Sequence, residues 1–140
     1  PGKLTKEEFE AMKQHTIIGA RMLDRLEMYH DEEMMKYAYE ICRWHHERYD
    51  GKGYPDGLKG EEIPISAQVV SLADVYDALS DRVYKKAYSH EKAMEMILNG
   101  ECGMFNPLLL ECLVEIQDKV RKELGIKGVN ECLEYLEERN

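Results

Sequence analysis

Residues 44–57 of the chain read Trp-His-His-Glu-Arg-Tyr-Asp-Gly-Lys-Gly-Tyr-Pro-Asp-Gly. The pair His45 and His46 ends a helical pattern, and a turn rich in glycine and aromatic residues comes directly after it. Imidazoles on a rigid element can bind a metal, and glycines let a loop backbone approach a ligand closely. Ordinary turn chemistry would also explain the glycines. Because they directly follow two histidines, the stretch favours a functional site around which the rest of the chain is arranged.

Length and composition predict one globular domain. The chain has 140 residues, of which 44% are hydrophobic and 34% charged, and the charges are interspersed among apolar residues. The formal net charge of −9 argues against a protein that binds nucleic-acid polymers through a basic face. A small phosphorylated ligand remains compatible, because bound metal ions can reverse the sign of the charge in a pocket.

The cysteines and the apolar runs predict a cytoplasmic protein without a membrane span. The four cysteines form no CxxC pair and no disulfide-dense pattern, which suits a reducing compartment. No apolar run approaches the roughly 18 residues that a span needs, and no signal peptide opens the chain. Pro1 and Gly2 read like the middle of a loop, so we expect a fragment of a longer protein.

Helical periodicity predicts an all-α fold of about seven helices without a sheet. Thr5 begins a capping box for a helix over about 6–15, and Gly19 predicts a bend or a second helix after it. Asp31 is the predicted N-cap of a helix that ends near Tyr49. Further helices are predicted after the caps Ser66, Ser89 and Asn106, with breaks at Gly125 and Gly128 before a last short helix.

The helix that begins after Ser66 is apolar nearly all round, which predicts a central buried helix. It contains Asp74 and Asp77, and a buried carboxylate needs a partner or a metal. The segment 50–64 before it is predicted to be a long loop, and such loops are usually functional.

The candidate metal ligands are His15, His45, His46 and Asp74. Neighbouring residues of a helix point about 100° apart, so the adjacent histidines are predicted to bind two metals, one imidazole to each. Imidazole and carboxylate together suit Fe, Mn or Zn. Such metals would activate water for attack on phosphorus and hold the phosphate oxygens.

Structural explanations compete with these assignments. A lone His15 on a half-apolar helix is more often a structural histidine, and two adjacent histidines alone favour neither alternative. The dipeptide His30-Asp31 lies where one helix ends and the next begins, so a capping role explains Asp31 better than metal binding. His90 comes after the Ser89 cap and is predicted to be exposed to solvent. The combination of candidates, and a carboxylate in an apolar helix, favours the metal site.

The stretch 45–55 resembles the signature of the HD-GYP domain family. Similar matches extend upstream and downstream of it, over residues 3–5, 12–16, 60–64, 72–79, 82–85 and 103–107. The resemblance covers residues 1 to about 113. It implies a helical HD-domain-like bundle, with residues 1–140 forming a single partial HD-GYP-like domain and residues 114–140 a C-terminal helical extension.

The resemblance also implies a function. Active members of this bacterial family are cyclic di-GMP phosphodiesterases with two or three metal ions, usually attached to receiver or sensor domains. By that resemblance His15, His45, His46 and Asp74 match the metal ligands. Gly53, Tyr54 and Pro55 match the loop after which the family is named. Together with Lys52, a candidate phosphate contact, they are the predicted substrate-binding residues.

Four departures from the family pattern qualify this expectation. The defining His-Asp pair and a nearby lysine precede the stretch that matches Pro1, so we expect a bundle truncated at its N-terminus, and the catalytic residues stay unassigned. Gln68 stands where members commonly have an arginine, and Asn106 replaces a usual aspartate. The segment 77–82 is also one residue shorter than usual, which would rotate the residues after it by about 100° if they are helical.

Three hypotheses remain open. In the first, the parent protein hydrolyses cyclic di-GMP, to a linear dinucleotide or to mononucleotides, while this fragment alone is inactive and binds metal weakly or not at all. In the second, the chain is a non-catalytic module that binds a nucleotide or a metal. In the third, it is a helical interaction module whose open apolar faces pair with another domain or with a second copy as a homodimer.

Overall fold

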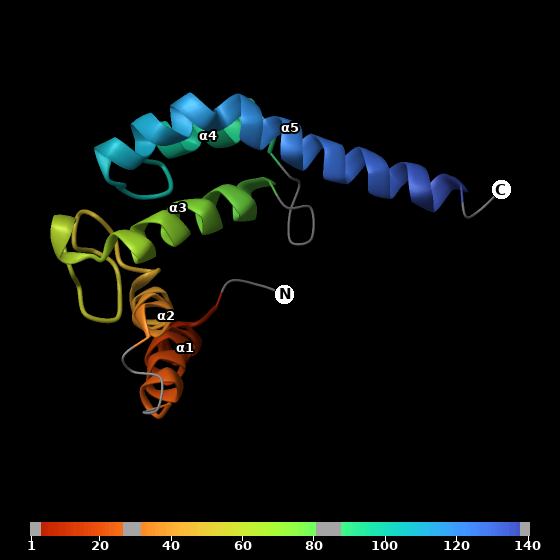
Figure 1. The fold of residues 1–140 in the computed structure, drawn as a ribbon. Coiled ribbons are helices and arrows are strands. Elements are labelled where there is room, and N and C mark those ends of the chain that lie inside the picture. The colour runs from red at the N-terminus through yellow and green to blue at the C-terminus, as the bar shows by residue number, and fades with distance from the viewer. Residues whose placement is uncertain (1–3, 27–31, 81–87, 138–140) are drawn as a thin grey trace. The chain divides into compact units, whose positions relative to one another are not determined.

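The computed structural model describes residues 4–26, 32–80 and 88–137, and from residue 124 onward it describes only the course of the backbone. Contacts divide the chain into two compact units, residues 1–106 and 107–140. The helices are α1 (Lys6–Asp24), α2 (Glu33–Trp44), the 3-10 helix η2 (Gly60–Glu62), α3 (Ile65–Ser80), α4 (His90–Leu98) and α5 (Pro107–Glu137) (Figure 1). The described residues contain no strand, which confirms the all-α class.

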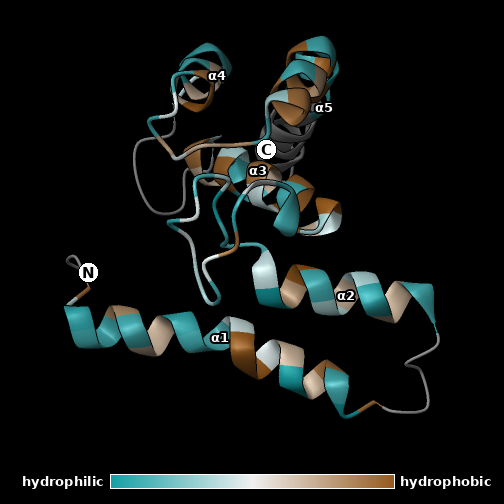
Figure 2. Cartoon of the chain, turned by 90° about the vertical axis from the view of Figure 1, so that its left-hand side faces the viewer, coloured by the Kyte–Doolittle hydropathy of each residue, from teal (hydrophilic) through white to brown (hydrophobic). Residues whose placement is uncertain are grey.

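The first unit is built on α1 and α2, which run side by side in opposite directions (Figure 2). Thr16 and Ala20 of α1 are buried, at 0% and 1% exposure. Gly19 lies against α2, since a Cβ added there would stand 3.6 Å from Cys42 Sγ. The predicted second helix after Gly19 is wrong, because α1 is one helix over Lys6–Asp24. One glycine costs a helix only about 1 kcal/mol, which packing against α2 can offset.

Packing in the first unit continues from α2 to α3 and from α3 to α4. The buried side chains of α3 are Ala67, Gln68, Leu72 and Tyr76, which form one stripe of the helix. The predicted burial of Asp74 and Asp77 is wrong, because both lie on the exposed side of α3. Two of the four exposed apolar residues of α3 are alanines, Ala73 and Ala78, which tolerate solvent at little cost.

The structure contains five α-helices among the described residues, fewer than the seven predicted. Two predicted breaks account for the difference. Besides Gly19, the glycines at 125 and 128 do not interrupt α5, whose backbone is helical through both. The second unit, residues 107–140, consists of this helix and the residues after it. The division of the chain into a domain and an extension from residue 114 stays a prediction.

The helix caps are partly as predicted. Thr5 accepts from the Glu8 amide at 3.2 Å while Glu8 reaches back to Thr5, which confirms the capping box. Ser89 caps α4 as predicted. Ser66 instead lies inside α3 and donates to Glu40 Oε2 at 2.6 Å, because the helix already begins at Ile65.

The expected cap of α2 is Asp31, which lies outside the described residues. The N-cap position falls on Glu32, whose side chain makes no capping bond. His90 is half-buried, not exposed as predicted, because its Nδ1 lies 2.7 Å from the hydroxyl of Tyr76. No helix in the part of the chain that the structure describes is long and apolar enough to cross a membrane.

Candidate metal and ligand-binding site

Three histidines converge at the end of α2. His15 lies on α1, His45 is the C-cap residue of α2, and His46 is next in the chain. One ring nitrogen from each of the three can be chosen so that all lie within 4.8 Å of one another. His15 Nε2 and His45 Nε2 are 3.5 Å apart. In the described residues this is the one cluster of histidine, cysteine or carboxylate groups with the spacing of a metal site.

Hydrogen bonds orient two of these imidazoles. His15 Nδ1 lies 2.7 Å from the Met12 carbonyl, and His45 Nδ1 lies 2.7 Å from the Ile41 carbonyl. A carbonyl only accepts, so each Nδ1 carries a proton and donates it. The neutral imidazoles then present unprotonated Nε2 atoms toward each other, which is the arrangement of metal-ligating histidines. The donor set therefore fits a divalent transition metal.

The structure brings the two adjacent imidazoles together, and the assignment of one imidazole to each of two metals stays a prediction. That assignment assumed that His45 and His46 continue a helix, whereas α2 ends at Trp44. With His45 as the cap and His46 in the turn after it, the rings lie 4.1 Å apart between centroids at an interplanar angle of 42°. Both imidazoles therefore reach the same place, beside His15.

His46 is held neutral at physiological pH. Burial, and the nearby His45, His15 and Arg48, lower the pKa of His46 to about 4. The ring of Tyr54 stacks on His46, with centroids 4.9 Å apart and an interplanar angle of 27°. Burial also raises the pKa of the Tyr54 phenol above its usual value, so it remains a hydrogen-bond donor. A neutral imidazole is the form that binds a metal.

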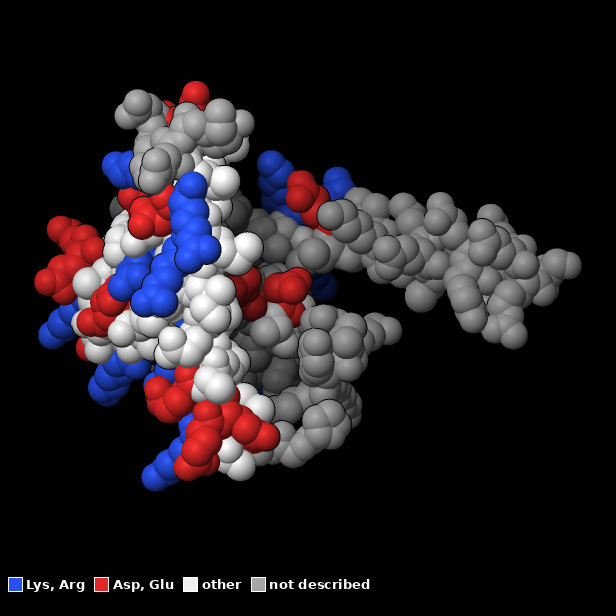
Figure 3. Space-filling model, turned by 90° about the horizontal axis from the view of Figure 1, so that it is seen from below, with Lys and Arg blue, Asp and Glu red and all other residues white. Residues whose placement is uncertain are grey.

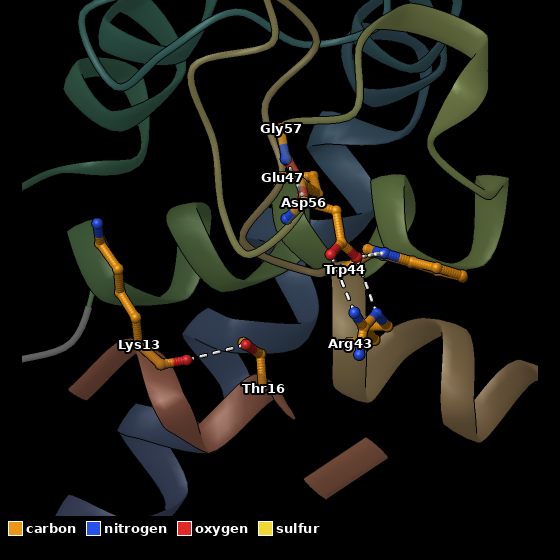
Figure 4. A network of polar contacts seen from close by, with 7 residues as sticks. All are labelled: Lys13, Thr16, Arg43, Trp44, Glu47, Asp56 and Gly57. Carbon is orange, nitrogen blue, oxygen red and sulfur yellow. Dashed lines mark hydrogen bonds and ion pairs between the residues drawn. The ribbon is translucent and has the colours of Figure 1, made fainter. Parts of the chain in front are cut away.

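Hydrogen bonds to Glu47, the residue after His46, hold the loop in place. Its carboxylate is 3% exposed, and Oε1 accepts from the backbone amides of Asp56 at 2.7 Å and Gly57 at 2.9 Å (Figure 4). A Cβ at Gly53 would overlap the Glu47 Cα and the Arg48 amide nitrogen. Glycine at 53 is thus required by the close approach of two backbone segments, not by an unusual φ.

A second set of bonds joins the same loop to the last turn of α2. Arg43 forms two bonds to the Asp56 carboxylate, at 2.8 and 2.9 Å, and Trp44 Nε1 donates to Asp56 Oδ2 at 2.7 Å (Figure 4). The bonds from Arg43 and Trp44 hold the pKa of Asp56 below its usual value. These bonds hold the loop in place, and Tyr54 of the same loop lies against His46.

A cavity of about 580 Å³ opens beside the cluster, within the size range of small-molecule sites. His45, His46, Asp74, Lys52, Gly53 and Tyr54 line it, together with Phe9, Lys13, Arg48 and Phe105. Asp74 is among the residues that line this cavity but does not belong to the three-histidine group. Lys52 is exposed and lies 3.6 Å from Asp50. Pro55 is joined to Tyr54 through a cis peptide bond.

Reasoning from sequence missed three residues of this site. Glu47 and Arg48 belong to the signature but have no predicted role, and Lys13 is only part of a matching stretch. Arg48 lines the cavity and donates from Nη1 to the Cys102 carbonyl. A charged residue directly after a ligand histidine was the available signal for Glu47. No local signal distinguished Lys13, whose place depends on α1 packing beside the loop.

Two departures from the family pattern touch each other. Gln68 is buried and donates from Nε2 to the Ile63 carbonyl at 2.7 Å, while its Oε1 accepts from Asn106 Nδ2 at 2.9 Å.

On the face shown in Figure 3, the described Lys and Arg side chains lie among Asp and Glu side chains and form no separate basic area.

Comparison with known proteins places these residues in a family. Residues 1–104 match the model of the HD domain. The chain is 47% identical over 121 residues to a cyclic di-GMP phosphodiesterase of Vibrio cholerae, covering 85% of this chain and 25% of that protein. It is 41% identical over 126 residues to a cyclic di-GMP phosphodiesterase response regulator of Xanthomonas campestris, covering 89% and 32%.

A further relative has a different named substrate. The chain is 38% identical over 120 residues to a 3'3'-cGAMP-specific phosphodiesterase of Vibrio cholerae, covering 85% of this chain and 22% of that protein. The chain thus spans about a quarter to a third of the length of these relatives. The family match, and relatives that are cyclic-dinucleotide phosphodiesterases, agree with the histidine pair and its Gly-Tyr-Pro loop. The chain therefore belongs to the HD domain family, in its HD-GYP branch.

Proposed function

We propose that this chain forms the metal- and ligand-binding part of a metal-dependent phosphodiesterase whose substrate is cyclic di-GMP. The observation that carries the proposal is the convergence of His15, His45 and His46 beside the Tyr54 loop and a cavity of about 580 Å³. The names of relatives that the chain matches over a quarter to a third of their length support the same substrate.

The three histidines would hold a divalent metal, and Asp74 is the proposed additional ligand from the cavity wall. Such metals supply an activated water and a counter-charge for the phosphate oxygens. The bonds from Nδ1 to backbone carbonyls fix His15 and His45 in the ligating tautomer. Because the pKa of His46 is low, its ring can bind a metal without first losing a proton. The two or three ions that the resemblance implies, and their identity as Fe, Mn or Zn, belong to this proposal.

The loop supplies the organic part of the ligand site. Tyr54 contributes an aromatic ring to the cavity, and this ring also stacks on His46. Nucleic-acid bases stack on aromatic side chains at about 1–3 kcal/mol each. Phe9 and Phe105 add apolar wall to the same cavity. Lys52, Gly53 and Pro55 are the other loop residues that we propose to be near the substrate.

The substrate class is a cyclic dinucleotide joined through two phosphodiesters. Relatives named for cyclic di-GMP and for 3'3'-cGAMP both cover most of this chain. The higher identity, 47% against 38%, favours cyclic di-GMP. A response regulator among the relatives supports an attached receiver or sensor domain in the parent protein.

The test is hydrolysis by the chain extended at its N-terminus with the sequence of its parent protein. With Mn²⁺ or Fe²⁺ supplied, the extended protein should cleave cyclic di-GMP faster than 3'3'-cGAMP, and His46→Ala should abolish turnover. His90→Gln is the matched control, because His90 lies outside the cluster and glutamine can keep a bond to Tyr76. No turnover with either metal would count against the proposed reaction.

Metal binding can be measured without turnover. Calorimetry of the 140-residue chain should give weak but measurable binding of Zn²⁺ or Mn²⁺ that His15→Ala weakens further, by about tenfold or more, whereas His90→Gln should not weaken it. Ligand and metal binding with no hydrolysis by the extended protein would favour the non-catalytic binding module. The proposed homodimer is tested by light scattering of the same chain.

A further inference from the structure

Lys13 occupies a defined place at the wall of the cavity. Its backbone carbonyl accepts from the hydroxyl of the fully buried Thr16 at 2.9 Å, which ties this turn of α1 to the core. Figure 4 shows the Lys13 side chain extended away from that bond. The ammonium lies 4.8 Å from the ring centre of Phe9 and 5.6 Å from that of Tyr54. The side chain is only 25% exposed.

The two rings give this lysine an orientation that a surface lysine lacks. A cation over an aromatic face gains about 0.5–1 kcal/mol at partly exposed sites. A lysine that is already oriented loses less side-chain entropy when a ligand binds. Lys52, on the loop of the same cavity, differs in this respect, because its side chain is 82% exposed and its partner Asp50 lies 3.6 Å away.

The present anion partner of Lys13 is easily replaced. Glu10 Oε1 lies 2.7 Å from Lys13 Nζ, but the Glu10 side chain is 68% exposed. Ion pairs of this kind contribute about 0–1 kcal/mol. An ammonium has three donors, so it can also keep Glu10 while it binds a second anion.

We infer that Lys13 binds a phosphate group of the cyclic dinucleotide, and that Phe9 and Tyr54 position its ammonium for this contact. The inference rests on the proposed function. An ammonium offers donors and no acceptor, so it selects the phosphate over the mixed edge of a base. Since Tyr54 also stacks on His46, the same ring links the phosphate-binding lysine to the histidine cluster.

The competing explanation is that Lys13 only covers the two rings. Lys13→Met separates the alternatives, because methionine keeps an apolar stem over the rings and removes the charge. Lys6→Met is the matched control, since Lys6 is an exposed lysine of the same helix that does not line the cavity. Glu10→Gln removes the competing anion and should act in the opposite direction.

The experiment is calorimetric titration of a hydrolysis-resistant phosphorothioate analogue of cyclic di-GMP into the N-terminally extended protein, with its metals, at several salt concentrations. Lys13→Met should raise Kd about tenfold and lower the slope of log Kd against log salt by about one. Glu10→Gln should lower Kd about two- to threefold, and Lys6→Met should leave Kd within about twofold. An unchanged Kd and slope for Lys13→Met would overturn the inference alone. No binding by the unsubstituted protein would overturn the proposed function and the inference together.

Discussion

Glu47 is the residue whose substitution most directly tests the account of the loop. Its Oε1 accepts two backbone amides of the loop, whereas Oε2 is buried and has no hydrogen-bond partner among the described residues. Glu47→Ala removes the acceptor for both amides. Glu47→Gln keeps an oxygen at that place and exchanges a buried, unpartnered oxygen for an amide nitrogen of nearly the same size.

The expected magnitudes come from these bonds. A donor left without an acceptor costs about 1–3 kcal/mol, and the two amides belong to Asp56 and Gly57, which water can partly reach. Taking the lower end for each, Glu47→Ala should reduce the free energy of unfolding by about 2 kcal/mol. Glu47→Gln should change it by less than about 1 kcal/mol, because the amides keep their acceptor.

The single tryptophan makes the measurement local. Trp44 Nε1 donates to Asp56, the residue whose amide Glu47 holds, so the indole reports on release of the loop. Urea unfolding followed by Trp44 fluorescence should give the free-energy differences, and emission of native Glu47→Ala should shift to longer wavelength. Equal destabilisation by both variants would refute the reasoning, because the effect would then come from the charge. An unchanged stability of Glu47→Ala would refute it as well.

Two further predictions concern the same loop. Gly53→Ala should destabilise the protein by about 2–3 kcal/mol and weaken metal binding, because its Cβ overlaps backbone atoms that cannot turn away. Urea unfolding and calorimetry check this, with Gly19→Ala as the control, because a Cβ there meets Cys42 Sγ at an ordinary contact distance of 3.6 Å. The lowered pKa of Asp56 in the folded state means that its contribution to stability is complete above its unfolded pKa of about 4 and is lost as pH falls through the lower folded value. Stability measured from about pH 6 to about pH 2 should therefore fall less steeply for Asp56→Asn, and an identical slope would contradict the assignment.

Local signals predicted the elements that local bonds determine. The Thr5 capping box, the Ser89 cap and the start of α5 at Pro107 all depend on side chains within a few residues of the helix end. Gly19 shows the limit of such signals. A glycine weakens a helix, but its cost was outweighed by contact with a cysteine on another helix, which no local pattern contains.

The site was likewise predictable where local sequence decides and not where distant contacts decide. The three histidines and the Gly-Tyr-Pro loop could be named from sequence, and the family resemblance strengthened the assignment of His15. The directions of the rings could not, because they depend on whether α2 ends before His45 or after it. Its termination at Trp44 coincides with the bonds from Arg43 and Trp44 to Asp56, a residue twelve or thirteen positions further along. Lys13 was missed for a similar reason, since its partners Phe9 and Tyr54 come from two separate segments.

The two departures at Gln68 and Asn106 carry less weight against activity than their number suggests. Taken singly, each removes a charge that the resemblance leads one to expect. In the structure they form one contact at 2.9 Å, so the arginine and the aspartate that the resemblance implies would stand opposite each other at these two positions. A change at only one position would leave a buried charge without its counter-charge, which is far more costly than a neutral pair. The two replacements therefore act as one substitution in the packing of α3, and neither residue belongs to the three-histidine group.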